Sequence, residues 1–445
     1  MISVIIPVKN SKRELERCLT ALGQSRFTDY ECIVADDGST DGSAEAATRY
    51  GCRVIRRSES GGPGAARNTG AREARGDILF FIDADVCVHP DSLSRVAEDF
   101  AEDPSLDALI GSYDENPDSP DFLSQYKNLM HCFVHQTGNE AASTFWGGCG
   151  AIRRAVFEQY SGFNEGYGRP SIEDIELGYR LSADGRRILL DKNLQVQHLK
   201  AWSFWRLLKT DIFDRGIPWT ELILRDANMP NDLNVQISQR ISVALVYLML
   251  AAVGAMAVQF KGLFLVPLLL LLVLLLSGYW FHNWHTEQSR GRLLLGIGAL
   301  FAASIYFAWR HHMLSLIPPL AVTLALIYLQ HRFLRGSRGW RVYSLLTGIC
   351  LGGTAIFILS FMPYHPMVIA PFVFLILVLF INSQFYVFLR GRKSFLFALA
   401  AIPFHLLYHF YNGISFCAGM ILYWTRRKPS HLPAKPAQRP ADPVK

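Results

Sequence analysis

The stretch Ile78-Leu79-Phe80-Phe81-Ile82-Asp83-Ala84-Asp85 decides the fold, because five apolar residues end abruptly on two aspartates. The apolar run is typical of a β-strand. In an extended backbone residues i and i+2 point to the same side, so Asp83 and Asp85 can face one ligand at the rim of a sheet. Two carboxylates in one place require a cation, and their hard oxygen atoms favour Mg²⁺ or Mn²⁺ bound to a diphosphate. A lone Asp-x-Asp is more often a solvated turn, so the neighbouring sequence has to decide.

Strands and helices alternate on both sides of this run. Ile2–Val8 is β-branched, and apolar residues between Leu15 and Leu22 then recur at helical spacing. Ser11 and Glu14 have the spacing of a capping box at the start of that helix. This alternation predicts an α/β domain with a mostly parallel sheet, which binds its ligands beyond the carboxyl ends of its strands. Further strands are expected at residues 32–35, 53–55 and 78–82, and further helices at residues 43–50 and 65–74.

The polar residues that follow the strands belong to stretches that resemble one family. In chain order they are IIPVKN, DDGSTD, GGPGAARNTG, FIDADV, FWGGCGAIRR and SIEDIELGYRL, within residues 1–215. Together they resemble the family 2 nucleotide-sugar glycosyltransferases, which have a GT-A fold with a Rossmann-like, mostly parallel sheet. The resemblance implies an inverting transfer from a nucleotide-diphosphate sugar, with Mg²⁺ or Mn²⁺ as cofactor. It also implies that Pro7 lines the nucleotide pocket, Asp37 contacts the base or ribose, Arg67 lies near the diphosphate, Asp83 and Asp85 hold the donor and the cation with Asp85 the firmer metal ligand, and Asp174 is the general base.

Simpler explanations exist for the residues around Arg67 and Asp174. Residues 60–64 are glycine-rich and lead into a helical stretch, so free N–H groups and the Arg67 guanidinium could hold an anion. An ordinary Gly-Pro loop explains this spacing equally well. Asp174 follows Ser171, a possible helix cap, so the helix dipole would favour its carboxylate whatever its role.

Trp146, Gly147 and Gly148 are candidates for the acceptor site, together with Glu173 beside the expected base. An aromatic face and a permissive backbone suit the close approach of a sugar and its acceptor. A tight structural turn explains the same residues equally well. His198 is a candidate third metal ligand, although a single histidine is more often structural.

Two other pairs at helical spacing are given no role in the site. Glu176 and Arg180 are four residues apart and are expected to form a surface ion pair. His131 and His135 are also four residues apart, but no further ligand cluster accompanies them. No zinc site is therefore expected.

The second half of the chain differs in composition from the first. Hydrophobic residues make up 50% of the whole, but Asp and Glu are concentrated before residue 235 and long apolar runs follow Arg240. We therefore expect a catalytic domain at residues 1–235, with interfacial helices at about 200–239, and an all-α multi-pass transmembrane domain at 240–424. Residues 425–445 are Pro-rich and expected to be disordered. The expected spans are residues 241–260, 262–281, 293–310, 313–330, 342–362 and 367–389, followed by a kinked or re-entrant segment at 395–424.

Basic residues set the expected orientation. The loops at residues 282–292, 330–341 and 390–393 hold most of the basic residues between the apolar runs. The positive-inside rule places these loops, and with them the catalytic domain, in the cytoplasm, with the protein in the cell membrane. The net charge of +6, from 44 basic and 38 acidic residues, owes much to such loops. Nucleic acid is therefore a poor candidate partner.

The expected acceptor is a membrane lipid or a lipid-linked glycan at the bilayer. An alternative is a polyprenyl-phosphate sugar transferase, whose acceptor oxygen is already ionised at neutral pH and needs a base less. An alternative from another class is a membrane transport or scaffold protein that binds a nucleotide sugar without turnover, although the apolar runs contain almost none of the charge that transport needs. Processive polymer synthases of the family carry a QxxRW motif, and residues 214–219, DRGIPW, depart from it. This departure argues against a polymer-making role.

Overall fold

The structure is a computed structural model that describes residues 1–259, 290–310, 314–318, 320–325 and 366–425, with residues 266, 269–270, 272–273 and 353. The chain divides into two compact units. The first comprises Met1–Ser119, Lys127–Gln236 and the described part of Tyr411–Lys445. The second comprises Pro120–Tyr126 and the described part of Ile237–Phe410.

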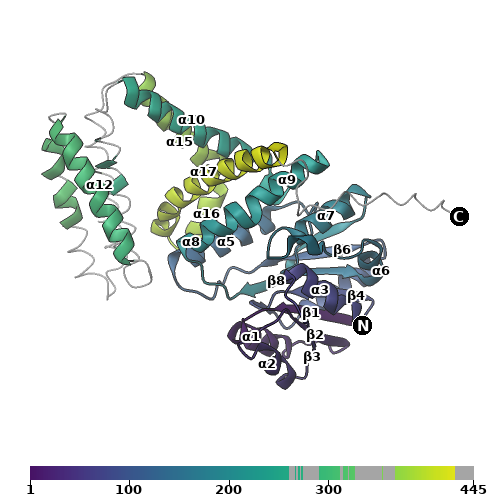
Figure 1. The fold of residues 1–445 in the computed structure, drawn as a ribbon. Coiled ribbons are helices and arrows are strands. Elements are labelled where there is room, and N and C mark those ends of the chain that lie inside the picture. The colour runs from purple at the N-terminus through teal and green to yellow at the C-terminus, as the bar shows by residue number, and fades with distance from the viewer. Residues whose placement is uncertain are drawn as a thin grey trace. The chain divides into compact units, whose positions relative to one another are not determined.

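An eight-stranded sheet forms the centre of the first unit, in the order β3-β2-β1-β4-β7-β6-β8-β5 (Figure 1). Strands β3, β2, β1 and β4 pair in parallel, and so do β6 and β8. Strand β7 is antiparallel to both β4 and β6, and β5 is antiparallel to β8. The predicted α/β sheet, with most neighbours parallel, is confirmed. The strands are β1 Ile2–Val8, β2 Tyr30–Asp36, β3 Arg53–Arg56, β4 Ile78–Ile82, β5 Val86–Val88, β6 Ala108–Tyr113, β7 Cys149–Arg153 and β8 Ile188–His198.

Helices between the strands bury the apolar faces that the sequence pattern predicts. The helix α1 buries Leu15, Cys18, Leu19 and Leu22, which is the expected helical spacing. The capping box is wrong, because Ser11 makes no side-chain cap bond. The helices of this unit up to β8 are α1 Lys12–Leu22, α2 Ser43–Arg49, α3 Gly62–Arg72, α4 Ser92–Glu102, α5 Phe122–Thr137, α6 Arg154–Gln159, α7 Glu173–Ala183 and the short 3₁₀ turn η1 Glu165–Tyr167, with α5 beginning in the second unit.

The core places the end of β4 in a rigid setting. Phe81 meets the rings of Phe145, Phe157 and Phe163, with centroid distances of 6.3, 5.2 and 5.1 Å. Each buried phenyl group contributes roughly 1.5–3 kcal/mol. Since β1 and β4 run in parallel and in register, Val8 and Ile82 end at the same edge of the sheet. The polar residues that follow them are therefore neighbours.

The helical turns that follow β8 pack against the end of the last helix, and both belong to the first unit. A π-helix, η2 Thr210–Gly216, separates α8 Phe204–Lys209 from α9 Ile217–Asp226, and the 3₁₀ turn η3 Leu233–Val235 follows. The last helix, α17 Phe395–Thr425, begins in the second unit, and its final part lies against η2 and α9 (Figure 1). A methyl group on Gly216 would come within 2.6 Å of the Ser415 side chain, and one on Gly419 within 2.5 Å of Thr220. These two glycines therefore permit the close packing.

The second unit is helical, with α10 Ile237–Gln259, α12 Arg290–Arg310, the turn η4 Leu314–Leu316, α15 Pro366–Ile381, α16 Ser383–Arg392 and the first part of α17. In the described part of the chain, α10 and α17 are long and apolar enough to cross a membrane. The span expected at 367–389 is not one straight helix, because α15 and α16 meet at Asn382 with a bend of 62°. Asn382 is buried and donates to the Ser242 hydroxyl at 2.8 Å and to the carbonyl of Val378 at 2.9 Å.

The structure describes some of the expected membrane spans and not others. The span expected at 241–260 coincides with α10, and residues 293–310 lie in α12. The spans expected at 262–281 and 342–362, and the tail from residue 426, lie wholly or largely outside the described residues, and the span expected at 313–330 is described only at residues 314–318 and 320–325. The segment at 395–424 forms one helix that contains Pro403.

Candidate functional site

A buried arginine links the two acidic motifs that the sequence singled out. Arg67 lies on α3 and is 4% exposed. Its Nη2 donates to Asp83 at 2.6 Å, and its Nη1 donates to Glu173 at 2.9 Å. Burial works against the charge, but the carboxylates of Asp83, Glu173 and Asp174 raise the pKa of Arg67, so the guanidinium stays protonated. The Arg67 guanidinium therefore pairs with a carboxylate that follows β4 and with a carboxylate at the start of α7.

Asp174 lies beside this arrangement with both oxygens bound to the backbone. Its Oδ2 accepts the N–H of Gly147 at 2.9 Å and its Oδ1 accepts that of Ile175 at 2.8 Å. The side chain stays partly exposed, and each carboxylate oxygen has a second lone pair. The Ser171 hydroxyl donates to the Asp214 carbonyl, so Ser171 is not the cap of α7. Asp174 is thus oriented by the loop that carries Trp146.

Asp85 and His198 lie together at the end of β8. The Nε2 of His198 is 3.6 Å from Asp85, and its Nδ1 is 2.7 Å from the Asn128 side chain on α5. Burial alone raises the pKa of Asp85, but the interaction with His198 and the charge of Lys200 bring it down to about 2. For Asp83, burial and the charge of Asp85 raise the pKa while Arg67 lowers it. Asp85 is therefore the more strongly ionised of the two carboxylates.

The two aspartates suit a divalent cation that takes most of its ligands from water and substrate better than a cation that is held by three or more protein side chains. Their side chains remain 37% and 27% exposed, so oxygen atoms of Asp83 and Asp85 are open to a ligand. Within the described residues, no group of three or more His, Cys, Asp or Glu side chains is arranged to hold a metal. Mg²⁺ commonly takes one or two carboxylates and completes its shell with water and substrate phosphates. The pair suits that mode of binding, and His198 stays a prediction as a third ligand.

Asp37 organises the glycine-rich loop. Its carboxylate is 3% exposed and accepts bonds from the Arg57 Nε, the Ser60 hydroxyl and the backbone N–H groups of Gly61 and Gly62, at 2.7–3.0 Å. Four donors therefore occupy the residue expected to contact the base or ribose. Its contact with the nucleotide remains a prediction, whereas its hold on residues 57–62 is a property of the fold.

Pro7 and the acceptor-site candidates Gly147, Gly148 and Glu173 also lie at or near this edge. Pro7 pairs with Ala35 in the sheet and is buried. A methyl group on Gly147 would meet the Arg67 guanidinium at 2.9 Å, and one on Gly148 would meet the Trp146 indole at 2.8 Å. Glu173 is 4% exposed and faces Arg67. The structure thus gathers the predicted donor, metal and base residues in one region of the first unit.

A group of rings that the sequence did not predict lines the same region. Tyr113 stacks on His198 at 4.3 Å and on His131 at 6.0 Å, and meets Trp146 edge-on at 4.8 Å. His135 lies 4.8 Å from Trp146. The spacing of His131 and His135 on one face of α5 was a signal, but nothing in the sequence indicated which partner that face would meet.

Two cations near the rings were also missed. Lys200 lies two residues after the end of β8, and its Nζ is 4.5 Å from the centroid of the Trp202 ring. Burial lowers the pKa of Lys200, Asp85 opposes the change and Arg215 adds to it, so these three charges are neighbours. Arg215 belongs to the stretch that departs from the QxxRW motif, and this position was the available signal.

Glu176 and Arg180 are not a surface pair. Glu176 is 1% exposed and receives the Arg180 Nε at 3.0 Å, with Arg225 at 3.5 Å. Arg180 also donates to the carbonyls of Tyr160 and Gly162. The pair supports the loop before α7 and remains outside the site, for a different reason from the one expected.

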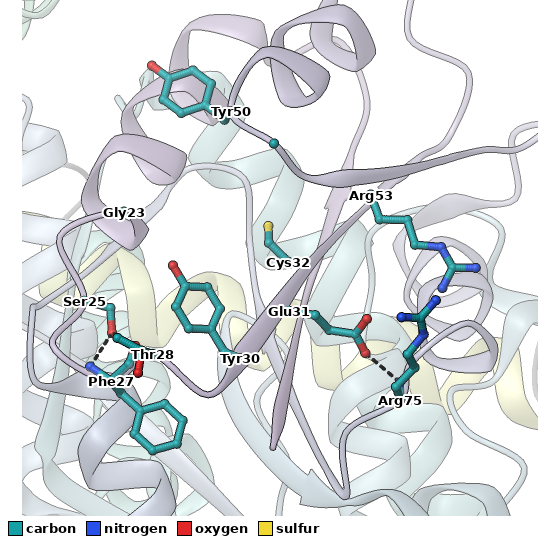
Figure 2. A pocket seen from close by; sticks show the side chains of 11 residues that line it. Gly23, Ser25, Phe27, Thr28, Tyr30, Glu31, Cys32, Tyr50, Arg53 and Arg75 are labelled. Atoms are coloured by element: carbon teal, nitrogen blue, oxygen red, sulfur yellow. Dashed lines mark hydrogen bonds between the residues drawn. The ribbon is translucent and has the colours of Figure 1, made fainter.

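A separate hollow of about 590 Å³ lies at the opposite edge of the sheet (Figure 2). Tyr30, Tyr50, Arg53 and Arg75 are among its lining residues. These residues begin β2 or β3, follow α2, or precede β4, so they lie at the amino ends of the parallel strands. The hollow is open and lacks the paired aspartates, so it is not the candidate site.

The amino-terminal part of the chain is similar in sequence to known proteins. Residues 3–161 match the family model described as Glycosyl transferase family 2. The glycosyltransferase AglE of Haloferax volcanii is 37% identical over 101 residues, which are 21% of this chain and 33% of that protein. The poly(ribitol-phosphate) beta-glucosyltransferase of Bacillus spizizenii is 36% identical over 118 residues, which are 25% of this chain and 18% of that protein. The matched segments span about a third or less of these relatives.

The chain also resembles solved structures, at low sequence identity. The mannosyltransferase PcManGT from Pyrobaculum calidifontis, in complex with GDP-Man and Mn²⁺, has a TM-score of 0.37 and 17% identity, with 80% of this chain and 86% of that chain covered. The Staphylococcus aureus TarS 1–349 structure in complex with UDP-GlcNAc has a TM-score of 0.37 and 19% identity, with 50% of this chain and 65% of that chain covered.

Proposed function

We propose that this chain, whose residues 3–161 form a glycosyl transferase family 2 domain, is an inverting glycosyltransferase that moves a sugar from a nucleotide-diphosphate donor to a membrane lipid or lipid-linked acceptor. The observation that carries the proposal is the buried Arg67, which joins Asp83 to Glu173 and so holds the two acidic motifs on opposite sides of one cation. A donor bound beside Arg67 would have its leaving group at Asp83 and its sugar near Asp174.

The donor side of the site is built to receive an anion. Arg67 is fully charged, and its Nε is buried without an acceptor among the described residues. The loop whose Gly61 and Gly62 N–H groups bind Asp37 leads into α3, so Asp37 fixes the start of the helix that carries Arg67. Charge that develops on a departing diphosphate would be stabilised by this fixed guanidinium.

A divalent cation, Mg²⁺ or Mn²⁺, would be held by Asp85 and Asp83 together with the donor phosphates. When bound, it would supply charge neutralisation at the leaving diphosphate. The side chains of the protein perform the remaining work. Arg67 opposes the rise that burial causes in the pKa of Asp83, and His198 and Lys200 lower the pKa of Asp85 to about 2. The Asp85 carboxylate in particular is therefore prepared for a cation at neutral pH.

Asp174 is the proposed general base. Its partly exposed carboxylate is fixed by Gly147 and Ile175, so it can accept the proton of an acceptor hydroxyl on the side of Trp146. If the acceptor were a polyprenyl phosphate, its oxygen would already be ionised and the need for Asp174 would fall. Acceptor class and base requirement are therefore coupled.

The chain offers surfaces suited to a lipid acceptor. In the first unit Trp205 is 64% exposed and Phe213 is 55% exposed, next to the basic residues Arg206 and Lys209. Aromatic and basic side chains together are typical of an interfacial segment. With α10 and α17 as candidate spans, they support a membrane-anchored enzyme, and we propose a cytoplasmic catalytic unit on the basis of the basic loops.

The test is release of free nucleoside diphosphate from a panel of nucleotide sugars by the full chain in detergent, with Mg²⁺ or Mn²⁺ and bacterial lipid extract. We expect metal-dependent turnover with one donor, and its loss in Asp85→Ala. Loss in Asp174→Asn as well would indicate a hydroxyl acceptor, whereas retention there would indicate a lipid phosphate. Binding of a donor without turnover under all conditions would instead support the rival transport or scaffold protein.

A further inference from the structure

A rare helical turn lies beside the candidate site. The π-helix η2 interrupts the helical stretch between α8 and α9, and such turns are rare and frequently found at functional sites. Asp211 and Arg215 are four residues apart in it, and a π turn closes over more residues than an α turn. The two side chains therefore leave the turn in similar directions.

Asp211 is held by a buried network that includes the last helix of the chain. The Lys127 Nζ donates to Asp211 Oδ2 at 2.6 Å, and the Tyr411 hydroxyl donates to the same oxygen at 2.5 Å. The three residues are 2%, 6% and 3% exposed for Lys127, Asp211 and Tyr411. Tyr411 is 200 residues away from Asp211 in sequence. Elements far apart in the chain thus fix the start of the π turn.

Arg215 lies at the other end of that turn and is partly buried. Within the described residues it makes no hydrogen bond or ion pair. Burial lowers the pKa of His131 and His135 on α5, and the charge of Arg215 lowers it further, so the guanidinium lies near this face. Asn128, on the same helix, contacts both His198 and the Lys200 carbonyl.

The carboxylates around Arg215 face other partners. Near it, α5 presents His131, His135 and the already paired Lys127, and the segment after β8 presents Lys200. The nearby carboxylates are Asp83 and Asp85, which face Arg67, His198 and the proposed cation, and Asp211, which is shared by two donors. Asp214, next to Arg215 in sequence, lies 3.8 Å from Arg169. A guanidinium without a carboxylate partner in such a place suits a phosphate group, which it binds through two parallel hydrogen bonds.

We propose that Lys127, Asp211 and Tyr411 are positioning residues that fix the π turn, so that Arg215 binds a phosphate group of a substrate, with Lys200 as a second cation. The inference rests on the proposed function for the identity of that phosphate. Two sources share the chemistry: the diphosphate of the donor and the phosphate of an anionic lipid acceptor.

Calorimetric binding to the full chain in detergent with Mg²⁺ separates the two sources. The probes are inorganic pyrophosphate and farnesyl phosphate, with farnesol as the uncharged control. We expect Arg215→Gln to weaken one of the two probes about tenfold, and Arg215→Lys to recover part of the loss. Pyrophosphate would assign Arg215 to the donor, and farnesyl phosphate would assign it to the acceptor. Native affinity of Arg215→Gln for both probes, or no binding of either to the native chain, overturns the proposal.

The positioning role needs a readout that simple loss of packing does not give. We expect Tyr411→Phe to weaken the same probe about threefold in the native background and not at all in the Arg215→Gln background. Tyr160→Phe, which removes a hydroxyl bond to Asp184 elsewhere in the same unit, is the matched control and should bind as the native chain does. No effect of Tyr411→Phe, or an equal effect in both backgrounds, overturns the positioning role.

These outcomes are distinguishable from failure of the proposed function. Binding is measured without turnover, so a chain that binds a phosphate probe through Arg215 and releases no nucleoside diphosphate would refute the transferase and retain the phosphate subsite. A chain that turns over a donor with Arg215→Gln as fast as the native chain, and binds both probes normally, would retain the transferase and refute the subsite.

Discussion

At the scale of single residues, Gly147 lies directly against Asp174 and Arg67. It donates its N–H to Asp174, and the space where a side chain would begin is filled by the Arg67 guanidinium. We predict that Gly147→Ala lowers kcat/KM by about 10- to 100-fold, because the methyl group displaces Arg67 or the backbone bound to Asp174. The measurement is nucleoside diphosphate release at several donor concentrations.

Gly23→Ala is the control for that substitution. A methyl group there would find its nearest atoms at 3.4 and 3.6 Å, which is ordinary contact, at the end of α1. The control should keep native turnover. Native turnover in Gly147→Ala would mean that neither Arg67 nor Asp174 needs its present position.

At the scale of elements, Asp99 on α4 lies near Asp191 on β8. This contact makes the stability of the fold at α4 sensitive to pH. Burial, and then the charge of Asp191, raise the pKa of Asp99 from 3.8 to about 6. A carboxyl whose pKa is higher in the folded state favours folding when protonated, so stability falls as pH rises from about 4 to 6. We predict that Asp99→Asn raises Tm by about 1–3 °C at pH 8 and has no such effect at pH 4, with a small size because the group is partly solvated.

Thermal denaturation of the full chain in detergent at both pH values checks this. Asp77→Asn is the control, since that side chain is 85% exposed and should leave Tm unchanged at either pH. An equal gain for Asp99→Asn at pH 4 and pH 8 would contradict the charge repulsion and would indicate a packing effect instead.

Elements with a local signature could be predicted, whereas their fine contacts could not. The apolar run before Asp83 and the helical spacing from Leu15 to Leu22 predicted β4 and α1 because periodicity is a property of neighbouring residues. The helix α1 begins directly after Ser11, as its spacing predicted, but the contacts of its first turn were not predicted correctly. The Lys12 N–H donates to Asp41 at 2.9 Å, and Asp41 also accepts the Ser43 N–H at 3.0 Å. One distant side chain thus binds the first turns of two helices, and local spacing cannot reveal it.

The same distinction applies to the site over the whole molecule. The sequence identified Arg67, Asp83 and Glu173 as separate motifs, but the bond between Arg67 and Glu173 joins residues 106 positions apart. Only the crossovers of the sheet bring these motifs together. Tyr411 belongs to no motif, and Arg215 lies only in a stretch that departs from one. Their significance depends on a π turn and on the return of α17 to the first unit.

The end of α17 should therefore be part of the folded first unit, in addition to any role that α17 has as a membrane anchor. Tyr411 binds Asp211, the Ser415 side chain lies over Gly216, and Gly419 lies against Thr220. We predict that a chain ending at Phe410 is less stable than one ending at Thr425 by at least about 2 kcal/mol, because the buried Asp211 loses a donor and apolar surface is exposed.

The comparison uses Tm and nucleoside diphosphate release for both truncated chains and for the full chain in detergent. The chain ending at Thr425 is the control and should match the full chain in both measurements. Gly419→Val in the full chain should reproduce part of the loss, because its side chain would begin 2.5 Å from Thr220 and force the helix away without removing any residue. If the chain ending at Phe410 keeps the Tm and turnover of the longer one, then the contacts of Tyr411, Ser415 and Gly419 do not support the site, and the catalytic unit is complete at residue 236.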